Sequence, residues 1–323
     1  MCDCKFLVGY SGETEFEVDQ AMFESVVKAK GQLKLLFRYE DTYKLLSDSV
    51  YEFELHLLKL GLRYQLGRAN TEGYEDFFDE ARQTISLKLI SLFTSGRIFI
   101  ERATSILKSL GMEDFAGEVF SEEFDQNFQY RLGEALRNHS LHRSLPLSRN
   151  VFSRKSLHEE ERFTVGTPVR DRFTVNPQIS VEEFTSSDKI RGKTKEEVEA
   201  LGVKYLDLKF IVRGYVAGLA RCHQKLRVGT EAAIEKSIGD IEKLVEHCKQ
   251  DGEEEAFLYI GSCNSGKWKN SKIEICPKRL RRIKELRFEK DTMSKLSVTF
   301  LSSEISKRKD SYPKSNDKLW ISE

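Results

Sequence analysis

Residues 77–110 read FFDEARQTISLKLISLFTSGRIFIERATSILKSL, and this stretch decides the fold class. Its apolar residues recur every three or four positions, which is the spacing of one face of an α-helix. The stripe consists of Phe77, Phe78, Ala81, Ile85, Leu89, Leu92, Phe93, Phe99, Ala103, Ile106 and Leu110. Gly111 suits a helix C-terminus, so one helix of about 35 residues is predicted. Gly96 lies inside it, where glycine costs about 1 kcal/mol relative to alanine, and this predicts close packing of a neighbour.

Four further stretches show helical spacing. The first follows a predicted Asp41 cap, runs from Tyr43 to Tyr64 and ends before Gly67, with a narrow heptad-like stripe typical of helix-on-helix packing. The second carries Phe124, Phe128, Leu132, Ala135 and Leu136, and Pro146 ends it. The stripes over 205–226 and 234–248 are separated by Gly229, which predicts a pair of antiparallel helices.

Short segments with strand character accompany the helices. The first twenty residues alternate around Gly9 and Gly12 and predict a hairpin. Residues 162–165 and 172–175 are short β-like pieces, and 256–260 with 272–276 predict a second hairpin. The expected fold is therefore mainly α, an antiparallel helical bundle with small β-hairpin additions. The expected domains are 1–150, a β-like insertion and linker at 151–200, a helical pair with hairpin at 201–302, and a flexible tail at 303–323.

The composition limits the classes of function. Lysine plus arginine equals aspartate plus glutamate, 52 against 52 in 323 residues, so nucleic acid is not held by a bulk positive field, although a local basic site is compatible with this balance. No apolar run approaches the roughly 18 residues of a membrane span, and the N-terminus does not look like a signal peptide. Six cysteines without framework spacing indicate reduced thiols. We expect a cytoplasmic protein with no membrane contact.

The chemistry is concentrated in the run Arg137-Asn138-His139-Ser140-Leu141-His142. On a helix, Asn138 and His142 lie one turn apart, and the long Arg137 side chain can reach toward the same side. An arginine fork binds phosphate and stabilises the extra negative charge of a pentacoordinate transition state. An imidazole can move protons at neutral pH. This set of groups suits RNA strand cleavage without a metal; the alternative is that these polar residues only decorate the exposed end of a helix.

The surrounding residues resemble the HEPN superfamily of helical-bundle proteins. Its signature is Arg, a polar residue, three variable residues and His, which here are Arg137, Asn138, the residues 139–141 and His142. The string from Phe128-Gln129-Tyr130-Arg131-Leu132 through Leu136-Arg137-Asn138 to His142-Arg143-Ser144-Leu145-Pro146 is similar to an uncharacterised bacterial branch of that superfamily. The resemblance covers about 70–150, is looser over 200–250, and does not extend to the flanking hairpins.

The resemblance implies a metal-independent endoribonuclease of the kind found in toxin–antitoxin, abortive-infection and antiviral defence systems. In such proteins two motif helices meet across a homodimer, and the implied roles are phosphate and transition-state binding by Arg137, acid–base transfer by His142 and orientation by Asn138. This chain has one copy of the motif, so a homodimer is implied if it is catalytic. Arg143 and Arg149 are candidate phosphate contacts, and no cofactor or metal is implied. The alternative is a non-catalytic HEPN-like module that binds RNA, a nucleotide or a protein partner, such as an antitoxin.

Three other patterns invite a chemical interpretation. Residues 261–267 match a phosphate-binding loop up to Lys267, but Trp268 stands where a Ser or Thr is required and no helix is predicted there, which favours a hairpin loop. Cys222-His223 and His247-Cys248 could meet across two helices, although buried structural cysteine is the commoner outcome. The basic run 278–284 could follow an RNA backbone, but a solvated helix face is more common.

Overall fold

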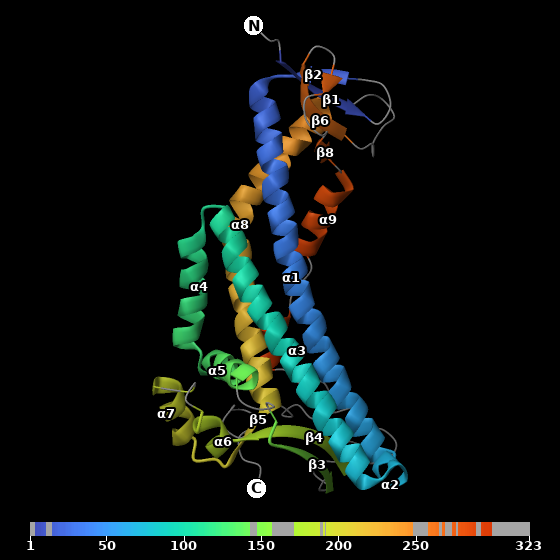
Figure 1. Cartoon of the computed structure of the whole chain (residues 1–323), viewed down its shortest axis with the longest axis vertical. Coiled ribbons are helices and arrows are strands. Elements are labelled where there is room, and N and C mark those ends of the chain that lie inside the picture. The colour runs from blue at the N-terminus through green and yellow to red at the C-terminus, as the bar shows by residue number, and fades with distance from the viewer. Residues whose placement is uncertain are drawn as a thin grey trace, which may run out of the picture. The chain divides into compact units, whose positions relative to one another are not determined.

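The computed structural model describes residues 4–10, 15–142, 147–156, 171–187, 190, 192–247, 258–264, 267–268, 273–275, 277–288 and 292–298. The helices are α1 (Gln20–Gln65), α2 (Arg68–Glu72), α3 (Tyr74–Ser109), α4 (Glu113–Gln126), α5 (Phe128–His142), α6 (Val181–Thr185), α7 (Gly192–Ala200), α8 (Leu208–His247) and α9 (Pro277–Phe288), with a 3-10 turn η2 at Met293–Val298 (Figure 1). The prediction of a mainly α protein is confirmed. None of the described helices is both long and apolar enough to cross a membrane.

The strands form two antiparallel sheets. They are β1 (Cys4–Tyr10), β2 (Glu15–Val18), β3 (Arg149–Ser156), β4 (Asp171–Ser180), β5 (Tyr205–Asp207), β6 (Leu258–Asn264), β7 (Lys267–Trp268) and β8 (Ile273–Ile275). One sheet has the order β2-β1-β6-β7, with β8 also paired to β6, and the other has the order β3-β4-β5. The predicted N-terminal and C-terminal hairpins are therefore present, and β1 pairs with β6 to join them into one sheet.

Helix α1 begins much earlier than the sequence predicted. The carboxylate of Asp19 accepts a hydrogen bond from the Met22 backbone N–H at 2.7 Å, which is an N-terminal cap, whereas Asp41 lies inside the helix. Buried apolar residues continue the heptad spacing upstream, at Val26, Ala29, Leu33, Leu36 and Tyr39. An internal aspartate that faces solvent does not stop a helix, so Asp41 was the wrong choice of cap. Gly67, with φ 71°, follows the helix end as predicted.

Helix α3 matches its prediction. After Ser109, Gly111 adopts φ 76°, and the Met112 N–H donates to the Leu107 carbonyl at 2.8 Å, which satisfies a carbonyl of the last turn. The close packing predicted at Gly96 is also confirmed. A Cβ built there would lie 2.8 Å from the Tyr215 hydroxyl oxygen, so no larger residue fits without a shift.

The predicted helix over 124–136 is two helices. Helix α4 ends at Gln126, and α5 begins at Phe128. Asn127 caps α5, because its side-chain oxygen accepts from the Tyr130 N–H at 3.2 Å. The Arg131 guanidinium donates to the carbonyls of Phe124 and Asp125 at 2.8 and 2.7 Å, and so satisfies the end of α4. The apolar spacing runs through this junction, which is why it did not reveal the break.

The predicted antiparallel pair over 205–248 is a single helix, α8, of 40 residues. Gly229 does not form a turn there. It lies within α8 against the Phe115 ring of α4, which occupies the space that a Cβ would need. A glycine that permits close packing and a glycine that ends a helix are identical in sequence, and the packing role applies here. One continuous helix also removes the antiparallel arrangement on which a Cys222/His247 metal set depended.

The chain divides into two compact units, each assembled from distant segments. Unit 1 comprises Met1–Thr42, Arg102–Ala116 and Gln224–Lys290, and unit 2 comprises Tyr43–Glu101, Gly117–His223 and Asp291–Glu323. This division follows tertiary pairing rather than the linear boundaries expected at 150, 200 and 302. The β-like piece at 162–165 and the tail at 303–323 lie outside the described residues.

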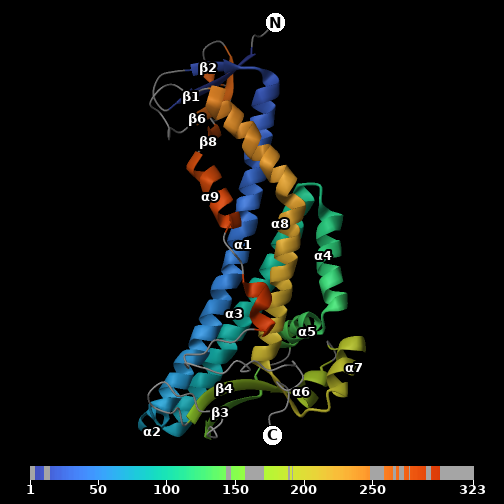
Figure 2. The ribbon, with the colours of Figure 1, turned by 180° about the vertical axis from the view of Figure 1, so that it is seen from behind.

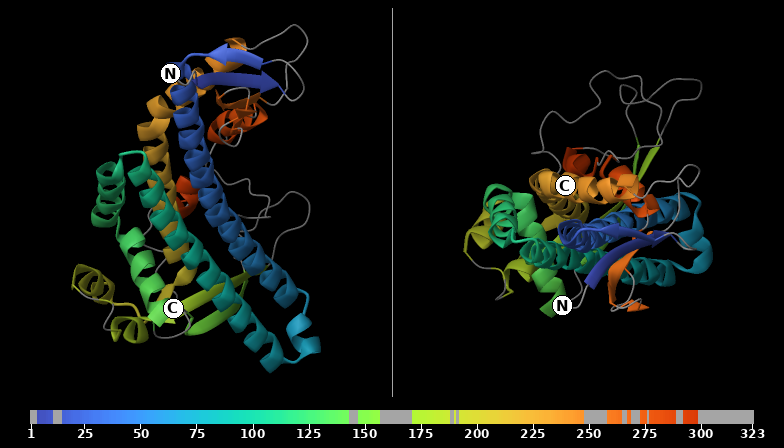
Figure 3. Two further views of the ribbon diagram at one scale, coloured as in Figure 1. Left: turned by 45° about the horizontal axis from the view of Figure 1, so that its top comes forward. Right: turned by 90° about the horizontal axis from the view of Figure 1, so that it is seen from above.

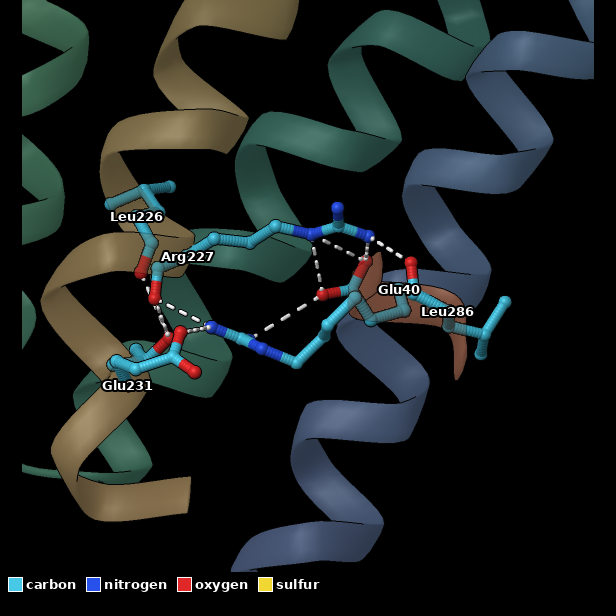
Figure 4. A network of polar contacts seen from close by, with 7 residues as sticks. Glu40, Leu226, Arg227, Glu231 and Leu286 are labelled. Carbon is cyan, nitrogen blue, oxygen red and sulfur yellow. Dashed lines mark hydrogen bonds and ion pairs between the residues drawn. The ribbon is translucent and has the colours of Figure 1, made fainter. Parts of the chain in front are cut away.

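Unit 1 combines a sheet with a helical core. Figure 3 shows the strands β1 and β2 beside the orange strand β6. The core joins β2, α1, α8, β6 and α9 through Val18, Val26, Ala29, Leu33, Leu36, Ile234, Ile238, Ile241, Leu244, Ile260 and Ile283. The unit also buries charge (Figure 4): Glu40 of α1 accepts two hydrogen bonds from the Nε of Arg227, at 3.0 and 3.2 Å, and one from its Nη2, at 2.6 Å. Arg287 of α9 lies 3.7 Å from the same carboxylate and 2.7 Å from Glu231.

Unit 2 contains the predicted antiparallel helices and the second sheet. Within it α1 and α3 run side by side in opposite directions, which both ribbon views show (Figures 1 and 2). The pairs Ser49–Ser95 and His56–Thr84, each at 2.8 Å, and the ion pair Arg63–Glu80 fix their register. Aromatic side chains of α1, α3 and β3, among them Tyr64, Phe77 and Phe152, pack together and connect the two helices to the sheet.

Candidate functional site

Helix α5 runs without interruption through the whole motif, from Arg137 to His142. Its position against α8 depends on glycines of both helices. Gly214 and Gly218 of α8 lie against the Gln129 and Tyr130 side chains of α5, and Gly133 of α5 lies against the Tyr215 side chain. Because there is no room for a Cβ at these three positions, the backbones of α5 and α8 approach closely there. This contact sets the position of the motif residues in unit 2.

Arg137 is buried rather than displayed on the surface. Arg137 is 7% exposed, and its Nη2 donates to the Glu134 carboxylate, one turn earlier in α5, at 2.8 Å. The other oxygen of Glu134 accepts from the Tyr215 hydroxyl at 2.8 Å. The Nε–H of Arg137 is buried and has no hydrogen-bond partner among the described residues. The interpretation of Arg137 as surface decoration is therefore wrong, because the guanidinium belongs to a buried network.

Tyr215 is the anchor of this network. It is fully buried, and burial, reinforced by the nearby Glu134 carboxylate, raises the pKa of its hydroxyl well above the usual value. Its hydroxyl therefore stays protonated and donates to Glu134, which keeps that carboxylate available as the acceptor for Arg137. Burial likewise raises the pKa of the neighbouring Tyr130. Two neutral phenols thus surround a compact carboxylate–guanidinium pair.

The remaining motif residues, from Asn138 to His142, continue α5 to its end. Asn138 is half-buried, and His139 is buried with its ring 5.7 Å from the Phe184 ring of α6. Helix α5 ends at His142, whose backbone position lies one turn after Asn138. The His142 side chain and the whole of Arg143 lie outside the described part of the chain. The structure thus brings Arg137 and Asn138 onto one helix, and the arrangement of His142 with Arg137 stays a prediction.

Arg149, the second candidate phosphate contact, lies in β3 as an exposed residue. Its Nε donates to Gln178 at 2.8 Å, and its guanidinium carbon lies 3.4 Å from the centre of the Tyr205 ring. The ammonium of Lys204 lies 5.7 Å from the same ring. Two cations beside one aromatic ring form a small basic surface patch, and its positive charge suits a phosphate.

The competing patterns have structural explanations. Gly261 to Asn264 lie in β6 and Lys267 lies in β7, paired with Asn264, so strands flank the glycine-rich segment and no helix begins at the lysine. In the basic run, Arg282 and Lys284 are exposed on α9 and pair with Glu285 and Glu242, while Ile283 is buried. Cys222 is buried against the Val119 carbonyl. Among the residues that the structure describes, no group of three or more candidate ligands could hold a metal ion.

Sequence reasoning missed two members of the Arg137 network. Glu134 could have been found, because an acid three residues before a base on one helix predicts an ion pair. Tyr215 could not, because it lies 81 residues from Glu134 and the two meet only through the close packing of α5 on α8.

The chain was compared with known protein families, curated proteins and solved structures. No protein-family model matches the chain, and neither a curated protein nor a solved structure does.

Proposed function

We propose that this chain is a metal-independent endoribonuclease of the HEPN type that cleaves RNA at a site assembled around α5 in a homodimer. The supporting observation is that one unbroken helix carries the whole motif, with the Arg137 guanidinium held by Glu134 while its Nε–H has no described partner. A guanidinium oriented through one nitrogen keeps donors for a phosphate oxygen.

In the proposed reaction the 2′-hydroxyl attacks the adjacent phosphorus and the 5′-oxygen of the next nucleotide leaves. Arg137 stabilises the negative charge that develops on the phosphoryl oxygens, and Asn138 orients the reacting groups. His142 transfers a proton, either from the attacking hydroxyl or to the leaving oxygen. Arg143 and the basic patch of Arg149, Lys204 and Tyr205 bind the neighbouring RNA backbone. A toxin or phage-defence role, with an antitoxin as a partner, fits an enzyme of this type.

A second candidate is a non-catalytic module that binds RNA, a nucleotide or a protein partner. The observation that favours it is the burial of Arg137, at 7% exposure, in an ion pair that already satisfies one of its nitrogens. For this module Arg137 is a structural cation that ties the end of α5 to α8 through Glu134 and Tyr215. The two candidates differ on whether loss of His142 changes a reaction or only a binding affinity.

Replacement of His142 by asparagine is expected to lower the rate of RNA cleavage by about 10²- to 10⁴-fold, the usual contribution of a general acid or base. The measurement is degradation of a labelled single-stranded RNA by purified protein. The matched control is His56→Asn on α1, which removes a histidine that lies outside the motif and hydrogen-bonds Thr84 of α3, and it should leave the rate unchanged.

The two candidates separate on the outcome. Cleavage by the unsubstituted protein and by the His56 variant, but not by the His142 variant, supports the enzyme. If no RNA is cut by any of the three, yet RNA binding is retained and weakens when Arg149 is replaced, the binding module is correct. Thermal melting of each variant establishes that the proteins compared are folded.

A further inference from the structure

Helix α1 carries a second apolar stripe, on the face opposite to its buried one. Between residues 45 and 66 the inward face buries Leu46, Val50, Phe53, Leu57 and Leu60. The outward face presents Tyr51, Leu55, Leu58 and Leu62, which are 43–65% exposed. Their spacings of four, three and four residues are those of consecutive a and d positions in a coiled coil. A row of large apolar side chains of this length on one exposed helix face marks an interaction surface.

The edge of this stripe has its own pattern. In the stripe, Tyr51 and Leu58 occupy d positions. The next position of each heptad, e, lies on the edge of the stripe and is occupied by Leu45, Glu52, Lys59 and Leu66. Leu45 and Leu66 are further exposed leucines, and the Leu66 N–H donates to the Leu62 carbonyl at 2.9 Å, so Leu66 still follows the helix. Read from either end, the order is leucine, charge, opposite charge, leucine. Two copies of this edge that run in opposite directions therefore place leucine against leucine and acid against base.

We propose that this stripe is the docking surface for a second copy of the chain, paired antiparallel about a two-fold axis. In that register Leu55 packs against Leu58 of the partner subunit, and Tyr51 packs against Leu62 of the partner subunit. On the edge of the seam, Glu52 meets Lys59 of the partner subunit, and Leu45 meets Leu66 of the partner subunit. The two-fold axis repeats every pair, so the same face of both subunits forms a self-complementary interface.

The parallel register fits less well. It places Lys59 opposite Glu54 of the partner subunit, whose side chain is 22% exposed and whose two oxygens both bind Arg213 at 2.7 Å. Glu52 also has a partner, Lys88 at 2.8 Å through one oxygen, but its side chain is 52% exposed and is open to a second cation. The parallel register also places Leu66 opposite Gly61 of the partner subunit, which offers no side chain to pack against. The antiparallel register instead pairs leucine with leucine and acid with base. Electrostatic complementarity of this kind fixes the orientation of a coiled coil.

This proposal goes beyond the proposed RNA cleavage and does not depend on it. The stripe is on α1, whereas the motif is on α5, so the α1 pairing is a separate contact from the one that a composite site requires. The readout is the mass of the assembly rather than degradation of RNA. If the α1 pairing is wrong, the measured mass will show it, and if the RNA cleavage is wrong, the RNA assay will show it.

The test compares Leu58→Glu with Leu87→Glu, because both leucines are exposed on neighbouring helices of unit 2 and only Leu58 lies in the stripe. Molar mass is measured by light scattering during size-exclusion chromatography of the full chain. The Leu58 variant is expected to halve the mass of the unsubstituted assembly, and the Leu87 variant is expected to leave it unchanged. An unsubstituted chain that is monomeric, or a Leu58 variant of unchanged mass, overturns the proposal.

Orientation is tested by disulfide trapping, with the unsubstituted chain as the background for its native cysteines. An equimolar mixture of Leu55→Cys and Leu58→Cys chains should give a cross-linked dimer, because these positions face one another only in the antiparallel pair. Each variant alone should not cross-link above background. Efficient cross-linking of either variant alone would show a parallel pair and contradict the proposed register. Because these substitutions are small and exposed, the result does not depend on tolerance of a new charge.

Discussion

Glu40→Ala is expected to lower the free energy of unfolding of unit 1 by about 3–5 kcal/mol, the usual cost of removing one partner from a buried ion pair. Glu40 is 5% exposed and is the carboxylate shared by Arg227 and Arg287. Without it, Arg227 loses the carboxylate that accepts from its Nε and Nη2, and it keeps its hydrogen bond to the Leu286 carbonyl (Figure 4). The largely buried Arg227 guanidinium would then lose its carboxylate partner, whereas Arg287 would keep Glu231. The measurement is urea denaturation followed by circular dichroism.

The matched control is Glu231→Ala, which removes the outer partner of the same Arg287. Glu231 is exposed, and its ion pair at 2.7 Å is screened by solvent, so its loss should cost about 0–1 kcal/mol. Equal effects of the two substitutions would contradict the buried network. Because Glu40 and the motif lie in different units, neither variant is expected to alter the contacts of Arg137.

Gly133→Ala is expected to destabilise unit 2 by about 3 kcal/mol, at the upper end of the cost of overpacking. A Cβ at this position would overlap the Tyr215 side chain close to its own Cβ, so a rotamer change cannot relieve the clash. The helices α5 and α8 would have to separate, which also disturbs the Tyr215–Glu134–Arg137 network. We therefore expect RNA cleavage to fall together with stability. Denaturation and the RNA assay measure the two effects on the same samples.

The control for this substitution is Gly117→Ala. Gly117 lies in α4 with nothing within 4 Å of a Cβ built on it, so the change should stabilise the protein by about 1 kcal/mol through helix propensity alone. Opposite signs for the two glycines are the expected result. A stabilising Gly133→Ala would mean that α5 does not pack closely on α8.

The helices were predictable wherever a single face is buried. Their ends were predictable only where a residue at the end itself, such as a glycine with positive φ, terminates the helix. Gly111 and Gly67 ended helices as expected because each adopts a positive φ. Gly229 was misread, because its small size serves a contact with Phe115, 114 residues away in sequence. Asn127 interrupts an apolar stripe that continues on both sides, so its capping role was hidden. Local chemistry is readable from sequence, whereas the distant residue that packs against a given position is not.

The same distinction applies to the site. The motif is local, so Arg137, Asn138 and His142 could be placed on one helix from their spacing. The burial of Arg137 could not be predicted, because it arises from Tyr215 on α8 and from glycines that admit α5. The union of the two hairpins into one sheet was equally hidden, since β1 and β6 are separated by most of the chain. Pairing of distant strands depends on the whole fold.

The central claim is that the α5 motif cleaves RNA through its 2′-hydroxyl without a metal. The most direct measurement presents the protein, in excess EDTA, with an RNA and with the same strand carrying 2′-deoxynucleotides. We predict that only linkages preceded by a 2′-hydroxyl are cut, that the products end in a 2′,3′-cyclic phosphate, and that His142→Asn slows the reaction by about 10²- to 10⁴-fold. Cleavage of the deoxy linkages, or equal cleavage by the His142 variant, would contradict the account.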